Sequence, residues 1–154
     1  MSLISQNEDD YVLLLRETDF PAYFQDLIHP EDYKIFNSPF IEKIFHKRIY
    51  HNRMFIRMCF KVDNSTFIPL TFIIDTGSPM FLYLCPKALE ELSFVIKEDE
   101  LGIKYINVNG KKFTVDETPH SHRNVNIIGL MALNNFGLYL KDLEFEFENL
   151  PEHF

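Results

Sequence analysis

The sequence has no tryptophan, only two cysteines and only five glycines among its 154 residues. Cys59 and Cys85 match neither a disulfide framework nor a metal-ligand spacing, so we expect a reducing compartment and no metal centre. No apolar run approaches the ~18 to 20 residues that a membrane span needs. The short apolar run at residues 11–15 follows acidic residues, whereas a signal peptide would have a basic flank. These absences predict a cytoplasmic protein with no membrane partner.

Basic side chains are also scarce. The chain has 15 Lys and Arg residues against 23 Asp and Glu residues, which leaves a net charge of −8. This charge argues against a general nucleic-acid-binding surface, so we expect no nucleic-acid partner. Apolar bulk, by contrast, is plentiful, because hydrophobic residues make up 46% of the chain and include 16 Phe. That is enough for the core of one ordinary domain.

The first 51 residues have helical features. Asp19 with Pro21, and Ser38 with Pro39, resemble helix starts, because a short polar side chain caps the first turn and proline is tolerated there. Beyond this second start, apolar residues recur near the helical period, at Phe40, Ile41, Ile44, Phe45 and Ile49. We therefore predict a helical N-terminal extension over residues 1–51.

The pattern changes to the strand period after residue 52. Apolar residues alternate with polar ones, which predicts a half-buried strand with Arg53, Arg57 and Lys61 on its solvent face. Asn109-Gly110 is typical of a type I′ hairpin turn, because both residues tolerate positive φ. Further short apolar segments follow, with little helix. Residues 52–154 are thus predicted to form a mainly β domain.

An ionisable residue interrupts the apolar stretch PLTFIIDTGSPMFLYL at residues 69–84, which has Asp75-Thr76-Gly77-Ser78 at its centre. A carboxylate in such a setting is costly unless it is paired, hydrogen-bonded or protonated. Together with NIIGLMAL at residues 126–133, the stretch resembles the doubled signature of the pepsin and retroviral-protease clan, and especially its retropepsin branch. The resemblance implies a mainly β fold, the closed or partly open barrel-like single lobe of an acid protease.

The same resemblance implies a homodimeric aspartic endopeptidase that acts on polypeptides without a cofactor or metal. Asp75 of each copy would supply one of two carboxylates that share a proton and activate a water molecule. Thr76 would hydrogen-bond across the dimer axis, and Gly77 would let backbone amides approach the carboxylates. Ser78 would hydrogen-bond the outer oxygen of Asp75. The supporting apolar-apolar-Gly element, packed across this turn, would be Ile127, Ile128 and Gly129.

A second interpretation is a non-catalytic dimerisation or peptide-binding module with the same fold. Retroviral-type enzymes close a flap over the substrate, and here only about residues 93–104 are available for one, with Lys97 to Glu100 at its tip. Pro79, which lacks a backbone N–H, and Phe81 stand where those enzymes usually carry polar residues. The reduced flap and Pro79 favour the module, whereas the intact Asp75-Thr76-Gly77 favours the enzyme.

The segment LEFEF at residues 143–147 alternates apolar and acidic residues, as an edge or interface strand would. In retroviral-type dimers the terminal strands of the two copies interleave into one sheet. The resemblance therefore makes residues 143–147 the candidate for the strand that enters a shared sheet.

Overall fold

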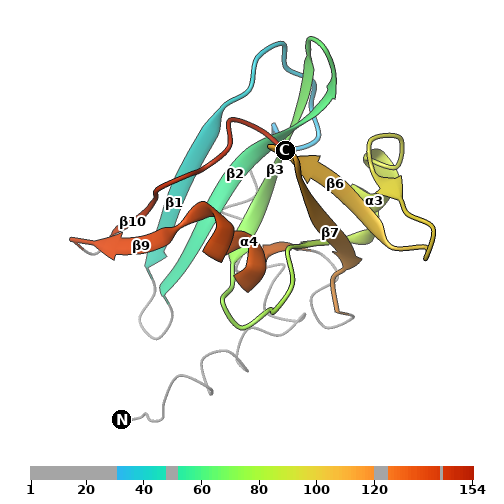
Figure 1. Ribbon diagram of the computed structural model, residues 1–154. Coiled ribbons are helices and arrows are strands. Elements are labelled where there is room, and N and C mark those ends of the chain that lie inside the picture. The colour runs from blue at the N-terminus through green and yellow to red at the C-terminus, as the bar shows by residue number, and fades with distance from the viewer. Residues whose placement is uncertain (1–30, 48–51, 120–124, 143) are drawn as a thin grey trace.

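The computed structural model describes residues 31–47, 52–119, 125–142 and 144–154, and their arrangement is shown in Figure 1. One mixed sheet of eight strands has the order β1-β2-β3-β8-β4-β7-β6-β5, and a separate hairpin pairs β10 with β9. The strands are β1 (Ile41–Lys47), β2 (Asn52–Asp63), β3 (Thr66–Ile74), β4 (Leu82–Leu84), β5 (Lys97–Glu98), β6 (Lys104–Val108), β7 (Lys111–Glu117), β8 (Asn126–Ile128), β9 (Leu138–Lys141) and β10 (Glu144–Phe147), and the helices are α3 (Pro86–Glu91) and α4 (Leu130–Phe136).

The prediction of a mainly β fold is confirmed; of the closed or partly open barrel-like lobe that was expected, the closed form is not found. β1 and β5 lie at opposite ends of the strand order and do not pair with each other within the described residues. The Asn109-Gly110 turn forms as expected, between β6 and β7, and both of its residues have positive φ. The structure is therefore an open mixed sheet.

β2 and β3 form the long antiparallel hairpin at the centre of the fold (Figure 1). Their pairing places Phe55 opposite Ile73 and, further along, Phe60 opposite Ile68. Because successive side chains of a strand point to opposite faces, the two pairs illustrate how apolar residues occupy both faces of the sheet. This hairpin is therefore buried on both sides, and not on one side as the alternation in the sequence predicted.

Phenylalanine fills the larger core. The rings of Phe60, Phe72, Phe136 and Phe154 contact one another, with centroid separations of 5.1 to 6.2 Å. The smaller cluster, on the other face of the sheet, consists of Phe55, Ile73, Val125 and Ile127. This smaller cluster includes Ile73 of β3 and Ile127 of β8, the two strands that end beside Asp75.

The segment 41–47 is a strand, so the predicted helix after Ser38 is wrong there. β1 pairs antiparallel with β2 along its whole length, from Ile41 opposite Met58 to Lys47 opposite Asn52. The apolar spacing in this segment fits a helix, but a helix would leave the edge of β2 without backbone partners. Pairing with that edge outweighs the local pattern, as tertiary context often does. Residues 1–30 and 48–51 of the predicted extension lie outside the described residues.

Residues 31–36 continue the same sheet on the other side of the hairpin. The Tyr33 N–H donates to the Pro69 carbonyl (3.0 Å), and Phe36 and Phe67 exchange two backbone hydrogen bonds of 2.8 Å. These contacts cover the half of β3 that β8 does not reach. The expected domain boundary at residue 52 therefore falls between two paired strands, because residues 31–47 add backbone partners to both β2 and β3.

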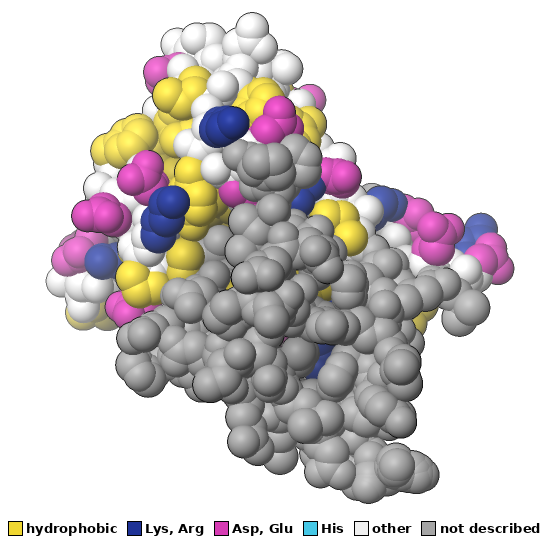
Figure 2. Space-filling model, turned by 180° about the vertical axis from the view of Figure 1, so that it is seen from behind, with side chains coloured by type: hydrophobic (Ala, Val, Ile, Leu, Met, Phe, Trp, Pro, Cys, Tyr) yellow, Lys and Arg dark blue, Asp and Glu magenta, His cyan; other side chains and the backbone are white. Residues whose placement is uncertain are grey.

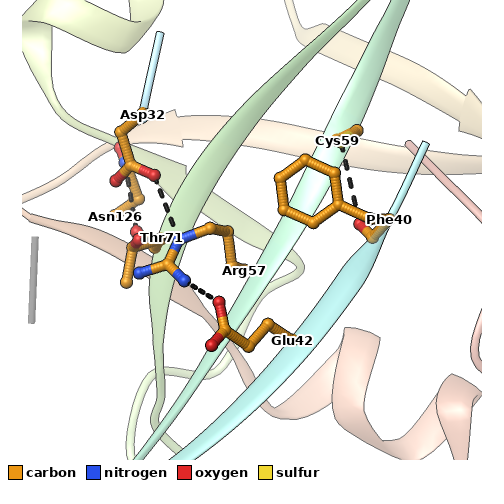
Figure 3. Close-up of polar contacts among 7 residues, drawn as sticks. All are labelled: Asp32, Phe40, Glu42, Arg57, Cys59, Thr71 and Asn126. Atoms are coloured by element: carbon orange, nitrogen blue, oxygen red, sulfur yellow. Dashed lines mark hydrogen bonds and ion pairs between the residues drawn. The ribbon is translucent and has the colours of Figure 1, made fainter. Parts of the chain in front are cut away.

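Arg57 is buried, although the strand pattern predicted it on the solvent face; only 2% of the residue is exposed. Its Nε donates to Asp32 Oδ1 (3.2 Å) and to Thr71 Oγ1 (3.1 Å), and one of its terminal nitrogens pairs with Glu42 (Figure 3). Burial raises the pKa of the Asp32 carboxyl, while the hydrogen bonds from Thr71 and Arg57 act in the opposite direction. Asp32 and Glu42 thus tie residues 31–47 to the centre of the sheet.

We predict that replacing Arg57 by methionine lowers the free energy of unfolding by about 3 to 5 kcal/mol, because Asp32 is left buried without its cation. The matched control is Lys61→Met on the exposed part of the same strand, for which we expect a change within about 0.5 kcal/mol. Urea unfolding followed by circular dichroism measures both. Equal stability of the two variants would mean that the buried ion pair does not anchor residues 31–47.

Candidate active site

Asp75 follows the last residue of β3 and is half-exposed. Its N–H donates to the Ile128 carbonyl (3.0 Å). On the side chain, Oδ1 accepts the Gly77 N–H (2.8 Å) and Oδ2 accepts the Ser78 hydroxyl (2.9 Å). Each carboxylate oxygen therefore has one donor from within the turn. The carboxylate is held in a single orientation while part of it stays open to solvent.

The turn is positioned by β8, which lies between the strand that enters it and the strand that leaves it. β3 runs parallel to β8, with Ile74 opposite Ile128. β4 runs antiparallel to β8, with Leu82 opposite the same Ile128. Ile127, Ile128 and Gly129 consequently lie across the Asp75 turn, and the structure brings together the two sequence motifs that lie far apart along the chain.

Gly129 sits where no side chain fits. A Cβ atom on this residue would lie 2.5 Å from the Met80 carbonyl oxygen and 2.7 Å from that of Ser78, both of which belong to the backbone. Its φ of −92° is open to any residue, so the need for glycine comes from this close approach and not from backbone conformation. The glycine allows α4 to start directly against the turn.

Thr76 and Gly77 are exposed at the tip of the turn, and Ser78 is half-buried behind them. The Thr76 hydroxyl makes no hydrogen bond with the described residues. Gly77 brings its N–H to the Asp75 carboxylate, and a Cβ there would lie 3.1 Å from Asp75 Oδ1. The tip thus offers another molecule one free hydroxyl and one half-exposed carboxylate.

Sequence reasoning missed three apolar side chains that adjoin the turn. Met80, Leu130 and Met131, here called the apolar rim, are 41%, 46% and 46% exposed. The Leu130 N–H donates to the Ser78 carbonyl (2.6 Å), and the Met131 N–H donates to the Met80 carbonyl (3.0 Å). In the sequence, only the apolar pair Leu130-Met131 directly after Gly129 could have indicated this rim. An apolar pair at the start of a helix, however, predicts burial as readily as exposure.

A tyrosine beneath the turn was also missed. Tyr83, in β4, is half-buried, and its hydroxyl accepts the N–H of Met80 (2.9 Å). Its ring packs against the smaller core cluster that contains Ile127. The apolar residues around Tyr83 in the sequence are typical of a buried strand. They gave no sign that its hydroxyl makes a hydrogen bond at the turn and that the residue is more than a core side chain.

The hairpin expected at residues 93–104 is present, but its tip is shifted. Lys97 and Glu98, expected at the tip, form β5 and pair with β6. Residues 99–103 make the tip, where Asp99 Oδ1 accepts the N–H groups of Leu101 and Ile103, each at 2.9 Å. No hydrogen bond or ion pair between described residues joins this hairpin to residues 75–78. The hairpin does not act as a closed flap in this structure.

The remaining predicted features lie away from the turn. β10, within the segment 143–147 that was expected to enter a shared sheet, pairs with β9 of its own chain. Cys59 and Cys85 are free and buried. Among the described residues no group of three or more His, Cys, Asp or Glu is placed to hold a metal ion.

On the face seen in Figure 2, acidic, basic and apolar side chains are interspersed over the described surface.

No protein-family model matches this chain, and neither a curated protein nor a solved structure matches it. Within the described part of the chain, no helix combines the length and the apolar character that crossing a membrane requires. The case for a function therefore depends on the geometry of the Asp75 turn itself.

We predict that Gly129→Ala lowers the free energy of unfolding by about 1 to 3 kcal/mol, because the added methyl group forces the backbone of Ser78 and Met80 away from α4. Asn134→Ala, at an exposed position of the same helix, serves as the control and should change stability by less than about 0.5 kcal/mol. Thermal unfolding measures both variants. A Gly129→Ala protein as stable as the control would show that the turn has room to move.

The tip of the β5–β6 hairpin should respond to pH through Asp99. The Lys112 ammonium, 2.6 Å away, is the main cause that lowers the pKa of the Asp99 carboxyl, and the Ile103 N–H adds to it. The ionised carboxylate therefore favours the ordered tip above the unfolded pKa of 3.8, and this contribution is lost as pH falls through the lower folded value.

An NMR titration of the Leu101 and Ile103 amide shifts measures this effect. We expect a midpoint below 3.8 for both amides, and no such transition in Asp99→Asn. A midpoint at or above 3.8 would mean that the Lys112 contact does not hold the carboxylate in solution.

Proposed function

We propose that the protein is an aspartic endopeptidase that works as a homodimer, with Asp75 of each copy forming one half of the catalytic site. The observation that carries the proposal is the carboxylate itself. It stands at the end of a buried strand, is oriented through both oxygens by Gly77 and Ser78, and remains half-exposed. The contact to Gly77 alone is ordinary turn chemistry, which Asp63 and Asp99 also show. What supports the proposal is that a second donor, the Ser78 hydroxyl, orients the other oxygen of Asp75.

The chemistry needs two carboxylates about 3 Å apart, which share one proton because like charges at that separation cannot both ionise. The unprotonated oxygen removes a proton from a water molecule held between them, and this water attacks the carbonyl carbon of the peptide bond. The protonated carboxyl donates to the carbonyl oxygen. When the C–N bond then breaks, the protonated carboxyl gives its proton to the nitrogen, one hydroxyl of the tetrahedral intermediate returns a proton to the other carboxylate, and the pair again shares one.

The requirement for a second copy follows from the sequence, because Asp75-Thr76-Gly77 occurs once in the chain. A two-fold axis beside the turn would bring Asp75 to Asp75 and Thr76 to Thr76. The exposed Thr76 hydroxyl, which has no partner among the described residues, is then available for a hydrogen bond across the axis. The apolar rim would lie next to that axis, where a partner or a polypeptide substrate could cover it.

The second candidate is a non-catalytic dimerisation or peptide-binding module. The short hairpin at residues 97–108 favours this candidate. Among the described residues its tip makes no hydrogen bond to the Asp75 turn, so it would exclude little water from a bound peptide. Pro79 also removes one backbone donor beside the carboxylate. The two candidates share the fold and differ in whether a bound peptide is cleaved.

We predict that the full chain cleaves members of a peptide library most rapidly on the acid side of neutrality, and that Asp75→Asn lowers the rate by about 10² to 10⁴. Asp116→Asn, which changes a carboxylate on β7 in the same way, is the control and should retain the activity. Unchanged cleavage by Asp75→Asn would eliminate the mechanism. Binding of the peptides without cleavage would support the module.

Sedimentation of the same samples tests the pairing on which the mechanism depends. The proposal requires a dimer population that rises with protein concentration together with the specific activity. Activity carried by a strictly monomeric protein would contradict it, because a single Asp75 turn provides one carboxylate.

A further inference from the structure

Tyr83 lies under the stretch of chain that carries Ser78. It belongs to β4, where it stands opposite Ile127 of β8, and its ring packs on the smaller core cluster. The ring also lies close to Gly129, since a Cβ there would be 3.0 Å from Tyr83 Cε1. From this buried base the hydroxyl reaches the N–H of Met80, at 2.9 Å. The side chain thus joins the core to the exposed side of the turn.

The backbone of residues 78–80 is held by a small set of hydrogen bonds. The Ser78 carbonyl accepts the Leu130 N–H, and the Met80 carbonyl accepts the Met131 N–H. Pro79 has no N–H to contribute. The Ser78 N–H donates to the Asp75 carbonyl (3.2 Å), and the Met80 N–H donates to the Tyr83 hydroxyl oxygen. The other contacts are between backbone groups, whereas this one depends on a single side-chain oxygen.

The position of this stretch decides where the Ser78 hydroxyl points. Ser78 Oγ donates to Asp75 Oδ2 at 2.9 Å, and hydrogen bonds of this kind weaken steeply when distance or angle changes. If Met80 loses its acceptor, Met80 keeps only its backbone contact with α4, while Ser78 stays tied to Asp75 through its own N–H. A shift of the stretch would then loosen the bond between Ser78 and the carboxylate.

We propose that Tyr83 is a positioning residue for the Asp75 carboxylate, acting through Met80 and Ser78; this inference rests on the proposed peptidase function. The hydroxyl keeps residues 78–80 in place so that Ser78 orients the outer oxygen of Asp75. Tyr83 does not reach the reacting atoms itself.

The test compares Tyr83→Phe, which removes one oxygen atom and keeps the ring, with Tyr139→Phe on the exposed strand β9. We expect kcat to fall about tenfold in Tyr83→Phe, as for the loss of one hydrogen bond, with KM changed less than about twofold. The acid limb of its pH–rate profile should move, because Ser78 no longer holds the carboxylate as firmly. Tyr139→Phe should match the unmodified protein in all three respects.

A double variant with Ser78→Ala shows whether Tyr83 acts through Ser78. If it does, Tyr83→Phe combined with Ser78→Ala loses no more activity than Ser78→Ala alone. Losses that multiply would overturn the route through Ser78, and a Tyr83→Phe enzyme with an unchanged kcat and pH profile would overturn the role altogether.

Hydrogen exchange at the Met80 amide adds a measurement that does not depend on activity. It should be faster in Tyr83→Phe than in Tyr139→Phe, because Met80 has lost its acceptor. An amide equally protected in both would overturn the proposal. An unmodified protein that cleaves no peptide would instead remove the proposed function, and the catalytic role of Tyr83 with it, even where Met80 exchange is accelerated.

Discussion

The hydrogen bond from the Asp75 N–H to the Ile128 carbonyl, 3.0 Å long, is the contact on which the candidate site depends. It joins the end of β3 to the end of β8, which has only three residues and pairs with β3 on one side and β4 on the other. One short strand therefore sets the positions of the chain entering and leaving the turn. Because Gly129 follows immediately and has no side chain, the backbones of α4 and residues 78–80 come into direct contact.

Much of this arrangement could be predicted from local sequence. An apolar run that ends in Asp75-Thr76-Gly77 predicts a buried strand followed by a tight turn, and Asn109-Gly110 predicts a hairpin. The proximity of Ile127, Ile128 and Gly129 to the turn followed from a resemblance, since nothing in the composition or periodicity of the two segments indicates that they meet. Whether Asp75 meets a second carboxylate depends on how two chains associate. Neither the sequence nor the structure of a single chain contains that information, so the pairing stays a prediction.

Two of the errors, at residues 41–47 and at Arg57, have a common cause, which is that both faces and both edges of the β2–β3 hairpin are covered. Residues 41–47 have the apolar spacing of a helix, yet they form a strand because the edge of β2 needs backbone partners. Arg57 alternates with apolar residues as a solvent-facing side chain would, yet it is buried because Asp32 and Glu42 come to it from segments well before it in the chain. The alternation of apolar and polar residues along a strand does not show whether a distant segment supplies a partner for one of its charged side chains.

The same three strands that hold the turn are joined by a polar network further from it, and this links the N-terminal segment to the site. Asn126 of β8 donates to the Thr71 carbonyl of β3 (3.4 Å) and accepts the Cys85 N–H just after β4 (2.9 Å). Arg57 and Asp32 meet at the Thr71 side chain, as Figure 3 shows, and Tyr33 Oη lies 3.4 Å from Cys85 Sγ. Buried polar groups are costly when they lose partners. Displacing residues 32–33 would therefore disturb β3, β4 and β8 together, so these two residues contribute to the structural support of the Asp75 turn.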